Sequence, residues 1–229
     1  PSDAEAVQRE KNLELALADD PTVKTLNARI SDNPSDGNAL YRRGQVYASK
    51  GAYRLALKDF DEVIRLNPKD VEAFNNRCFV RTVVDQLDAA LKDCDEALRL
   101  RPNFVDALME RATALMAMRR FEQALLTVDT ALALSPKLAG AWNNRGYILQ
   151  HMNRGEEAIV CFEKALALEP NFPEALLSYG AALFEAKRFE DAVAAYEKAL
   201  ALDPNNALVR QNYDLFREIY DRTQRRRDR

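Results

Sequence analysis

Six prolines recur along the chain at one fixed interval, and this interval constrains the fold more than any other feature of the sequence. They are Pro34, Pro68, Pro102, Pro136, Pro170 and Pro204, each 34 residues after the one before. Proline cannot continue the interior of a helix, because it lacks the backbone N–H and its ring clashes with the preceding turn. A fixed interval of this length is typical of stacked supersecondary units. The chain of 229 residues is therefore expected to form an elongated array.

Other columns keep the same interval and indicate how each unit folds. One column holds only small residues, namely Gly44, Cys78, Ala112, Gly146 and Gly180, and another holds Ala56, Ala90, Ala124, Ala158 and Ala192. Small side chains suit the crossing of two helices, because larger ones would push the backbones apart. Apolar residues follow helical spacing between the prolines, and each run breaks midway, as at Lys50-Gly51 and Met118-Arg119. The sequence predicts an all-α array of antiparallel helix hairpins.

These columns resemble the tetratricopeptide repeat (TPR), whose pattern runs Trp, Leu, Gly, Tyr, Ala, Phe, Ala, Pro. The fullest match is formed by Trp142, Arg145, Gly146, Ala158, Phe162, Ala165 and Pro170. The main departure is arginine in place of the leucine, at Arg43, Arg77, Arg111 and Arg145. The resemblance implies a right-handed superhelical solenoid that serves as a non-enzymatic interaction scaffold.

The columns divide the chain into three expected parts. Residues 35–206 hold five TPR units, at 35–68, 69–102, 103–136, 137–170 and 171–204. Residues 1–34 look like a degenerate helical hairpin, which Asp19-Asp20-Pro21 would break and cap. Residues 207–229 are expected to form a capping helix, ending near Arg222, and a basic tail. For the tail residues Arg225-Arg226-Arg227, a frayed and solvated end is favoured over a docking or localisation signal.

The three cysteines give no metal site. Their odd number and the lack of CxxC spacing argue against zinc. The repeat places Cys78 and Cys94 on the two helices of one hairpin, so a disulfide is conceivable in an exported protein. Small buried thiols are the favoured interpretation, because cysteine is often buried as a small apolar residue. A cytoplasmic location is expected, with export left open.

The sequence argues against catalysis and against several classes of partner. His151 is the only histidine, and its place beside a turn indicates an exposed side chain. There is no glycine-rich phosphate loop, so neither an enzyme nor a cofactor is expected. The formal net charge of -3 argues against general nucleic-acid binding. No apolar run approaches the roughly 20 residues that span a membrane.

In TPR proteins the first helix of each hairpin lines a concave groove, and this resemblance implies the candidate binding residues. They are Tyr41, Gln45, Asn75, Asn76, Phe79, Glu110, Thr113, Asn143, Asn144, Tyr147 and Ser178. Asparagine is a poor residue for a helix interior, and its amide can bond to a peptide backbone. Exposed aromatic residues among these amides would anchor a partner, whereas inward-facing ones would be ordinary packing, which we expect for at least half of them.

The charge of the expected groove indicates which partner it accepts. Chaperone-binding relatives hold a C-terminal carboxylate with a clamp of Lys, Asn, Asn, Lys and Arg, and the matching residues here are Tyr41, Gln45, Asn76, Asp106 and Glu110. These residues supply no cation. The groove also carries Glu72, Glu174 and Glu185 against Arg42. A protein or peptide that is neutral or basic is therefore expected, rather than an acidic C-terminus.

Two alternatives to a free-standing adaptor remain open. The repeats resemble the substrate-recruiting arms of bacterial O-linked glycosyltransferases, so they could belong to a larger enzyme. A self-assembling scaffold with stacked solenoid ends is the other alternative. For the adaptor, a monomer or a weak homo-oligomer is expected.

Overall fold

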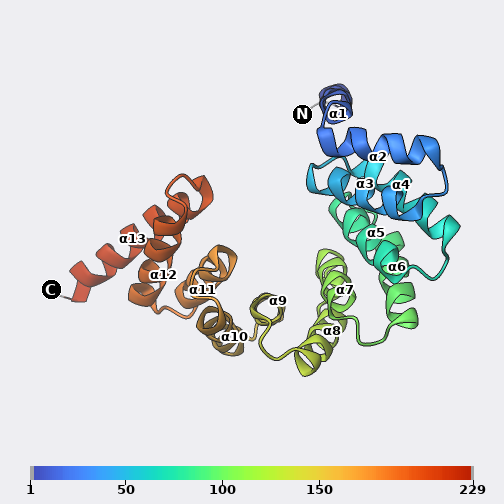
Figure 1. The fold of residues 1–229 in the computed structure, drawn as a ribbon. Coiled ribbons are helices and arrows are strands. Elements are labelled where there is room, and N and C mark those ends of the chain that lie inside the picture. The colour runs from blue at the N-terminus through green and yellow to red at the C-terminus, as the bar shows by residue number, and fades with distance from the viewer. Residues whose placement is uncertain (1–2, 228–229) are drawn as a thin grey trace. The chain divides into compact units, whose positions relative to one another are not determined.

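The computed structural model describes residues 3–227 of the chain, and these form thirteen α-helices (Figure 1). Their bounds are α1 Asp3–Ala18, α2 Pro21–Asp32, α3 Gly37–Ser49, α4 Tyr53–Leu66, α5 Val71–Val83, α6 Leu87–Leu100, α7 Val105–Ala117, α8 Phe121–Leu134, α9 Ala139–His151, α10 Gly155–Leu168, α11 Pro173–Glu185, α12 Phe189–Leu202 and α13 Ala207–Arg227. The predicted all-α fold is confirmed. The chain divides into two compact units, Pro1–Met118 and Arg119–Arg229.

Consecutive helices pack in pairs within each unit. We call the first helix of each 34-residue repeat the A helix and the second the B helix. The A helices are α3, α5, α7, α9 and α11, and α13 stands in the same register. In the first unit α5 lies between α3 and α7, and in the second unit α9 lies beside α11. The B helices end two residues before the repeated prolines, as the sequence predicts.

The turn between an A helix and its B helix always contains one residue with a positive φ. Gly51 has a φ of 79°, and the same column holds Asp85, Arg119, Asn153 and Lys187 with values between 58° and 61°. After Gly51, the backbone N–H of Ala52 donates to the carbonyl of Tyr47 at 2.8 Å. This bond closes a Schellman motif, in which a left-handed residue ends the helix and satisfies its last carbonyls.

The column of small residues faces a column of large ones across each hairpin. An added Cβ would lie 2.7 to 2.8 Å from an aromatic ring in three hairpins, formed by Gly44 with Phe60, Gly146 with Phe162 and Gly180 with Tyr196. The three rings are fully buried. Glycine is therefore required where the backbone of the A helix meets the ring of the B helix.

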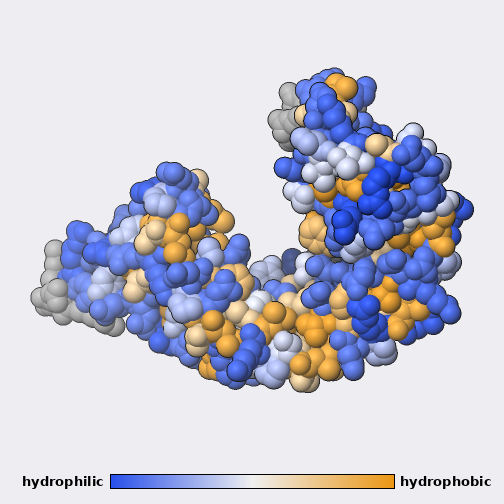
Figure 2. Space-filling view, viewed as in Figure 1, coloured by the Kyte–Doolittle hydropathy of each residue, from blue (hydrophilic) through white to orange (hydrophobic). Residues whose placement is uncertain are grey.

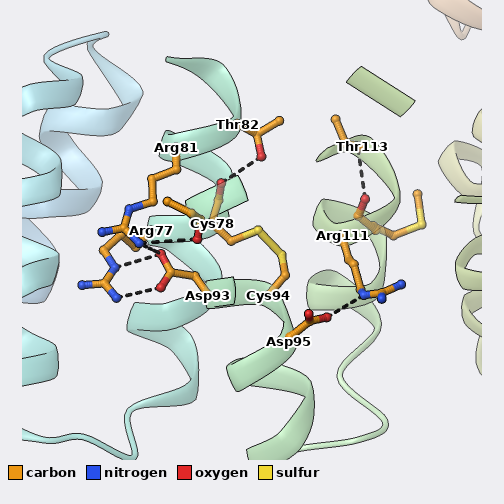
Figure 3. Close-up of a disulfide and its surroundings, with 11 residues drawn as sticks. Arg77, Cys78, Arg81, Thr82, Asp93, Cys94, Asp95, Arg111 and Thr113 are labelled. Atoms are coloured by element: carbon orange, nitrogen blue, oxygen red, sulfur yellow. Dashed lines mark hydrogen bonds and ion pairs between the residues drawn. A yellow bond between two sulfur atoms is a disulfide. The ribbon is translucent and has the colours of Figure 1, made fainter. Parts of the chain in front are cut away.

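The same pair of columns holds Cys78 and Cys94 in the hairpin of α5 and α6, and the two form a disulfide (Figure 3). The favoured expectation of two separate thiols was wrong. These columns are the closest contact within a hairpin, and here both hold a small residue, so the two Cα atoms lie only 5.5 Å apart. That separation is within the range that a disulfide spans. The third cysteine, Cys161, is buried and free.

The arginine column, which departs from the TPR pattern, ties successive hairpins together. Arg77 donates to Asp93 of its own hairpin at 2.9 and 2.7 Å, and to Asp61 of the preceding B helix at 2.6 Å. The bond to the preceding B helix recurs along the array in the pairs Arg43–Asn27, Arg111–Asp95, Arg145–Asp129, Tyr179–Glu163 and Tyr213–Glu197. The polar column therefore replaces an apolar contact with a ladder of hydrogen bonds.

The two ends differ from the regular hairpins. At the N-terminal end, Asp20 caps α2 by accepting from the backbone N–H of Thr22 and Val23, and Pro21 opens the helix, which confirms the predicted break. At the C-terminal end, α13 continues to Arg227, five residues past the predicted Arg222, so the basic tail begins inside a helix. Arg225 is exposed, and the side chains of Arg226 and Arg227 lie outside the described residues.

Hydropathy follows the packing of the helices. In the space-filling view, the visible face of the first helices of the chain is mostly hydrophilic, with smaller hydrophobic patches between them (Figure 2). Within residues 3–227, no helix is both long enough and apolar enough to cross a bilayer.

Candidate functional site

The predicted binding residues all lie on A helices, and they are distributed over both units. In the first unit they are Tyr41 and Gln45 on α3, Asn75, Asn76 and Phe79 on α5, and Glu110 and Thr113 on α7. In the second unit they are Asn143, Asn144 and Tyr147 on α9, and Ser178 on α11. We call the surface made by these helices the A-helix face of each unit. Because α3, α5 and α7 are neighbours, the candidates in the first unit form one surface.

Tyr41 and Gln45 line a real cleft on this surface. The cleft has a volume of about 610 Å³ and lies between α3, the end of α4 and the start of α5. The phenol oxygen of Tyr41 accepts from Asn76 Nδ2 at 2.7 Å and from Gln45 Nε2 at 3.2 Å. Burial raises the pKa of Tyr41, and the nearby Glu72 adds to this effect. The hydroxyl of Tyr41 is thus held in place by two amide donors at the wall of the cleft.

Asn75 and Asn143 occupy the same repeat column and share an unusual state. The Oδ1 atom of each is buried and has no hydrogen-bond partner among the described residues, although both side chains are half-buried. A buried acceptor without a partner costs about 1–3 kcal/mol. The adjacent Asn76 and Asn144 are also half-buried. Each unit therefore presents an asparagine pair, with one unsatisfied amide oxygen beneath the surface.

Two aromatic side chains stand exposed in one column beside the asparagine pairs. Phe79 is 38% exposed and Tyr147 is 41% exposed. Tyr147 packs at 4.4 Å against His151, which itself stacks at 5.1 Å on Phe121; the imidazole is exposed, as predicted. By contrast, Phe184 stacks on Phe216 at 3.9 Å and is only partly exposed. The expectation that some groove aromatics turn inward thus holds for Phe184.

Glu110 is the most perturbed carboxylate on the A-helix face. Burial, followed by the charge of Asp106 one helical turn away, raises the pKa of Glu110 to about 7. Glu110 makes no ion pair within the part of the chain that the structure describes. On the same helix, Thr113 is exposed and its hydroxyl donates to the carbonyl of Met109 at 3.0 Å. On α11, Ser178 is half-buried.

One cation beside the face was missed by counting charges along the A helices. Arg101 lies just before α7, and its Nη1 pairs with the carboxylate of Glu72 at 2.7 Å. The pair offsets one of the acidic charges expected for the groove. Its signal in the sequence was weak, because Arg101 and Glu72 are 29 residues apart, near opposite ends of the unit 69–102. The face is therefore less acidic than the sequence suggests.

Comparison with known protein families agrees with the 34-residue helical repeat. The tetratricopeptide repeat models match residues 37–70, 139–172 and 173–206. A model described as the protein prenyltransferase alpha subunit repeat matches residues 121–152. No curated protein sequence is similar enough to be counted as a relative.

Solved structures share the fold at low sequence identity. TTC0263, a thermophilic TPR protein of Thermus thermophilus, is 24% identical with a TM-score of 0.69, over 79% of this chain and 98% of that one. YrrB, described as a TPR protein with an unusual peptide-binding site, is 20% identical with a TM-score of 0.60, over 82% and 97%. PilF of Pseudomonas aeruginosa is 19% identical with a TM-score of 0.72, over 81% and 84%.

Paired helices in a 34-residue register, with small residues at each crossing, define a helical-repeat solenoid. The matched repeat models show that residues 37–70, 139–172 and 173–206 of this solenoid are tetratricopeptide repeats. The TPR fold is that of a protein–protein interaction scaffold, and it is typically not catalytic.

Proposed function

We propose that the A-helix faces bind a polypeptide segment of a partner protein. The observation that carries the proposal is the pairing of exposed aromatics with amides. Phe79 stands beside Asn75 and Asn76, and Tyr147 stands beside Asn143 and Asn144 in the same columns. Exposed aromatic residues anchor partners, and amides can bond to a peptide backbone irrespective of its side chains. A TPR protein of the same fold, YrrB, is described as having a peptide-binding site.

The partner segment is neutral or basic in this proposal. Asp106 and Glu110 lie one turn apart on α7, and no cation of residues 3–227 is recorded in an ion pair with Glu110. A lysine or arginine of the guest beside them would favour the charged form of Glu110 and offset the cost of its burial. An acidic C-terminus would meet like charge and none of the cations of a carboxylate clamp, so a co-chaperone role is not proposed.

Substitutions on the A-helix face test the proposal. We would isolate partners from cells of the source with the tagged wild-type chain and with the double variant Asn76→Ala/Phe79→Ala. The matched control is Leu126→Ala, because Leu126 is an exposed leucine on the B helix α8. Partners should be lost with the double variant and retained with the control. Equal recovery by all three chains would contradict the proposal.

A calorimetric titration tests the preference for charge. A peptide ending in EEVD should show no binding at micromolar concentrations, because the positions that match a carboxylate clamp hold no cation. Micromolar affinity for that peptide would contradict the proposed preference.

A further inference from the structure

The helix α2 occupies the place of a B helix in an incomplete hairpin. Arg43 Nη1 donates to Asn27 Oδ1 of α2 at 2.7 Å, just as Arg77 Nη1 donates to Asp61 Oδ1 of α4 at 2.6 Å. The residues of both pairs are 16 positions apart. The helix α2 therefore contacts α3, the first regular A helix, as a preceding B helix would.

The helix α1 does not sit where the A helix of this hairpin belongs. Its contacts with α2 are sparse, and Figure 1 shows it end-on beside α2, which is seen along its length. Leu13 and Leu17 of α1 pack in a cluster with Tyr47 and Tyr53. Glu14 forms an ion pair with Arg54 at the start of α4. These contacts hold α1 near the turn between α3 and α4.

A local cause explains this departure. The regular hairpins turn at a residue with positive φ, and the column of Gly51 places Leu17 at that point in the first hairpin. The side chain of Leu17 is buried in the cluster that contains Tyr47. Instead, α1 continues to Ala18, and the chain turns later, before Pro21. The later turn sends α1 away from the regular position.

As a result, the contact surface for an A helix is uncovered. Thr22 is exposed, whereas the same column holds the fully buried Ala56 and Ala90. Val46 is half-buried, whereas its equivalents Val80 and Ala114 are fully buried. These residues line a cleft of about 810 Å³ between α2 and α3, together with Pro21, Thr25, Leu26, Arg29, Arg42, Gln45 and Ser49.

We propose that this cleft is a docking site for one amphipathic helix of a partner protein. The docked helix replaces the missing A helix, with its apolar side on Leu26 and Val46. A glycine or alanine stands where it crosses α2, as at Gly44 against Phe60. An acidic residue faces Arg42, since the charged residues lining the cleft are Arg29 and Arg42. Arg29 is bound to Asp36 at 2.7 Å, whereas Arg42 has no ion pair among the described residues.

The terminal helices of the chain itself are poor occupants. In the column of Gly44, the sequence places Glu10 in α1 and Asp214 in α13. A carboxylate at the closest crossing would be driven against the side chain of Leu26 and would lose its hydration. This argument excludes both the chain's own α1 and the α13 of a second copy, and it leaves a helix of a different protein.

A peptide with the required features is present in the sequence and serves as the probe. A fluorescein-labelled synthetic peptide of Pro173–Glu185 carries Gly180 at the crossing, Leu176 and Leu183 on its apolar side, and two glutamates. Fluorescence anisotropy with the full chain should show saturable binding. The cleft-filling variant Thr22→Trp and the charge reversal Arg42→Glu should each weaken binding at least tenfold. Both replaced side chains are exposed, so the fold should be retained.

Matched controls separate this site from other surfaces. The variant Arg65→Glu, at an exposed arginine of α4, should bind the peptide like the wild type. A peptide carrying Gly180→Phe should not bind. No saturable binding, or equal affinity for Thr22→Trp and the wild type, would overturn the proposal.

Two further measurements test whether α1 or a second copy of the chain occupies the cleft instead of a partner helix. The pair Glu10→Cys/Leu26→Cys stands in the columns of Cys78 and Cys94, so its oxidation to a disulfide would place α1 in the cleft. A dimer in light scattering that Thr22→Trp converts to a monomer would assign the cleft to a second copy. Either result overturns the proposal, which expects free thiols in the first case and no effect of Thr22→Trp on mass in the second. The docking site adjoins the A-helix face of the proposed function and shares Arg42 and Gln45 of α3 with it, whereas Thr22 on α2 belongs to the docking site alone.

Discussion

Arg77 and Asp93 form a two-point ion pair that joins α5 to α6, with Nε–Oδ2 and Nη2–Oδ1 distances of 2.9 and 2.7 Å. The Asp93 side chain is 4% exposed, and Arg81 also donates to it at 2.7 Å. A buried carboxylate is tolerated only when its charge is matched and its lone pairs are bonded. The two arginines meet both needs.

Removing Arg77 should therefore destabilise the first unit. Arg77→Ala leaves Asp93 with Arg81 alone, and we expect a loss of about 2–4 kcal/mol in the free energy of unfolding. Urea unfolding followed by circular dichroism measures it. Arg99→Ala is the control, because Arg99 pairs with Glu96 on the surface one turn away, and such pairs contribute little. Equal effects of the two substitutions would contradict the role given to Arg77.

Replacing either of two glycines of α9 with alanine should change the stability of the chain, but in opposite directions. In Gly146→Ala, the new Cβ would lie 2.7 Å from the Phe162 ring, and overpacking of this kind costs about 1–3 kcal/mol. In Gly140→Ala, nothing lies within 4 Å of the new Cβ, and the better helix propensity gains up to about 1 kcal/mol. Thermal unfolding of both variants measures these changes. A Gly146→Ala chain as stable as the wild type would contradict the packing of Gly146 against Phe162.

The disulfide should contribute measurably to stability. Cys78 and Cys94 are 16 residues apart, and closing a loop of that length is worth about 3 kcal/mol. Reduction of the wild-type chain with dithiothreitol should lower its unfolding midpoint. The variant Cys78→Ala/Cys94→Val adopts the pair that stands at Ala112 and Val128, and its midpoint should be unchanged by reductant. A wild-type unfolding midpoint that does not change with dithiothreitol would contradict the presence of the disulfide.

The same bond bears on location. Disulfides persist in oxidising compartments and are rare in the cytosol. We therefore expect the chain isolated under native conditions to carry one free thiol, that of Cys161. Three thiols in alkylation and mass spectrometry would contradict the disulfide and agree with the cytoplasmic expectation drawn from the sequence.

Glu110 should make stability depend on pH. Its pKa rises from 4.5 to about 7 on folding, so the folded state holds the proton more tightly than the unfolded one. Stability is then highest below pH 4.5 for this group and falls as pH rises through 7, by at most about 3 kcal/mol. Glu110→Gln should be more stable than the wild type at pH 8 and equal to it at pH 4. A difference in stability between Glu110→Gln and the wild type that does not change with pH would contradict the raised pKa of Glu110.

Much of the fold could be predicted from the sequence, because it rests on local rules repeated many times. Pro68 and its equivalents mark where B helices end, and Gly51 and its equivalents mark the turns. The disulfide was missed because no rule based on spacing alone says that Cys78 faces Cys94. The facing columns of Gly44 and Phe60, also 16 residues apart, held that signal.

The candidate site was predicted less completely. The sequence placed Phe79 and Tyr147 on A helices, but it could not say that they are exposed while Phe184 packs inward. Their exposure depends on neighbouring helices, such as the one that brings Phe216 against Phe184. Arg101 beside Glu72 was missed because the contact joins opposite ends of one repeat, 29 residues apart in the sequence.

Site-specific photo-crosslinking tests the central claim, that the A-helix faces hold the guest, most directly. A benzophenone amino acid would replace Phe79, Tyr147 or, as the control, the 71% exposed Leu126 of α8, and crosslinking would be done in living cells. We predict adducts to the same polypeptide from positions 79 and 147, and none from position 126. Adducts formed from position 126 alone, or equally from all three positions, would contradict the account.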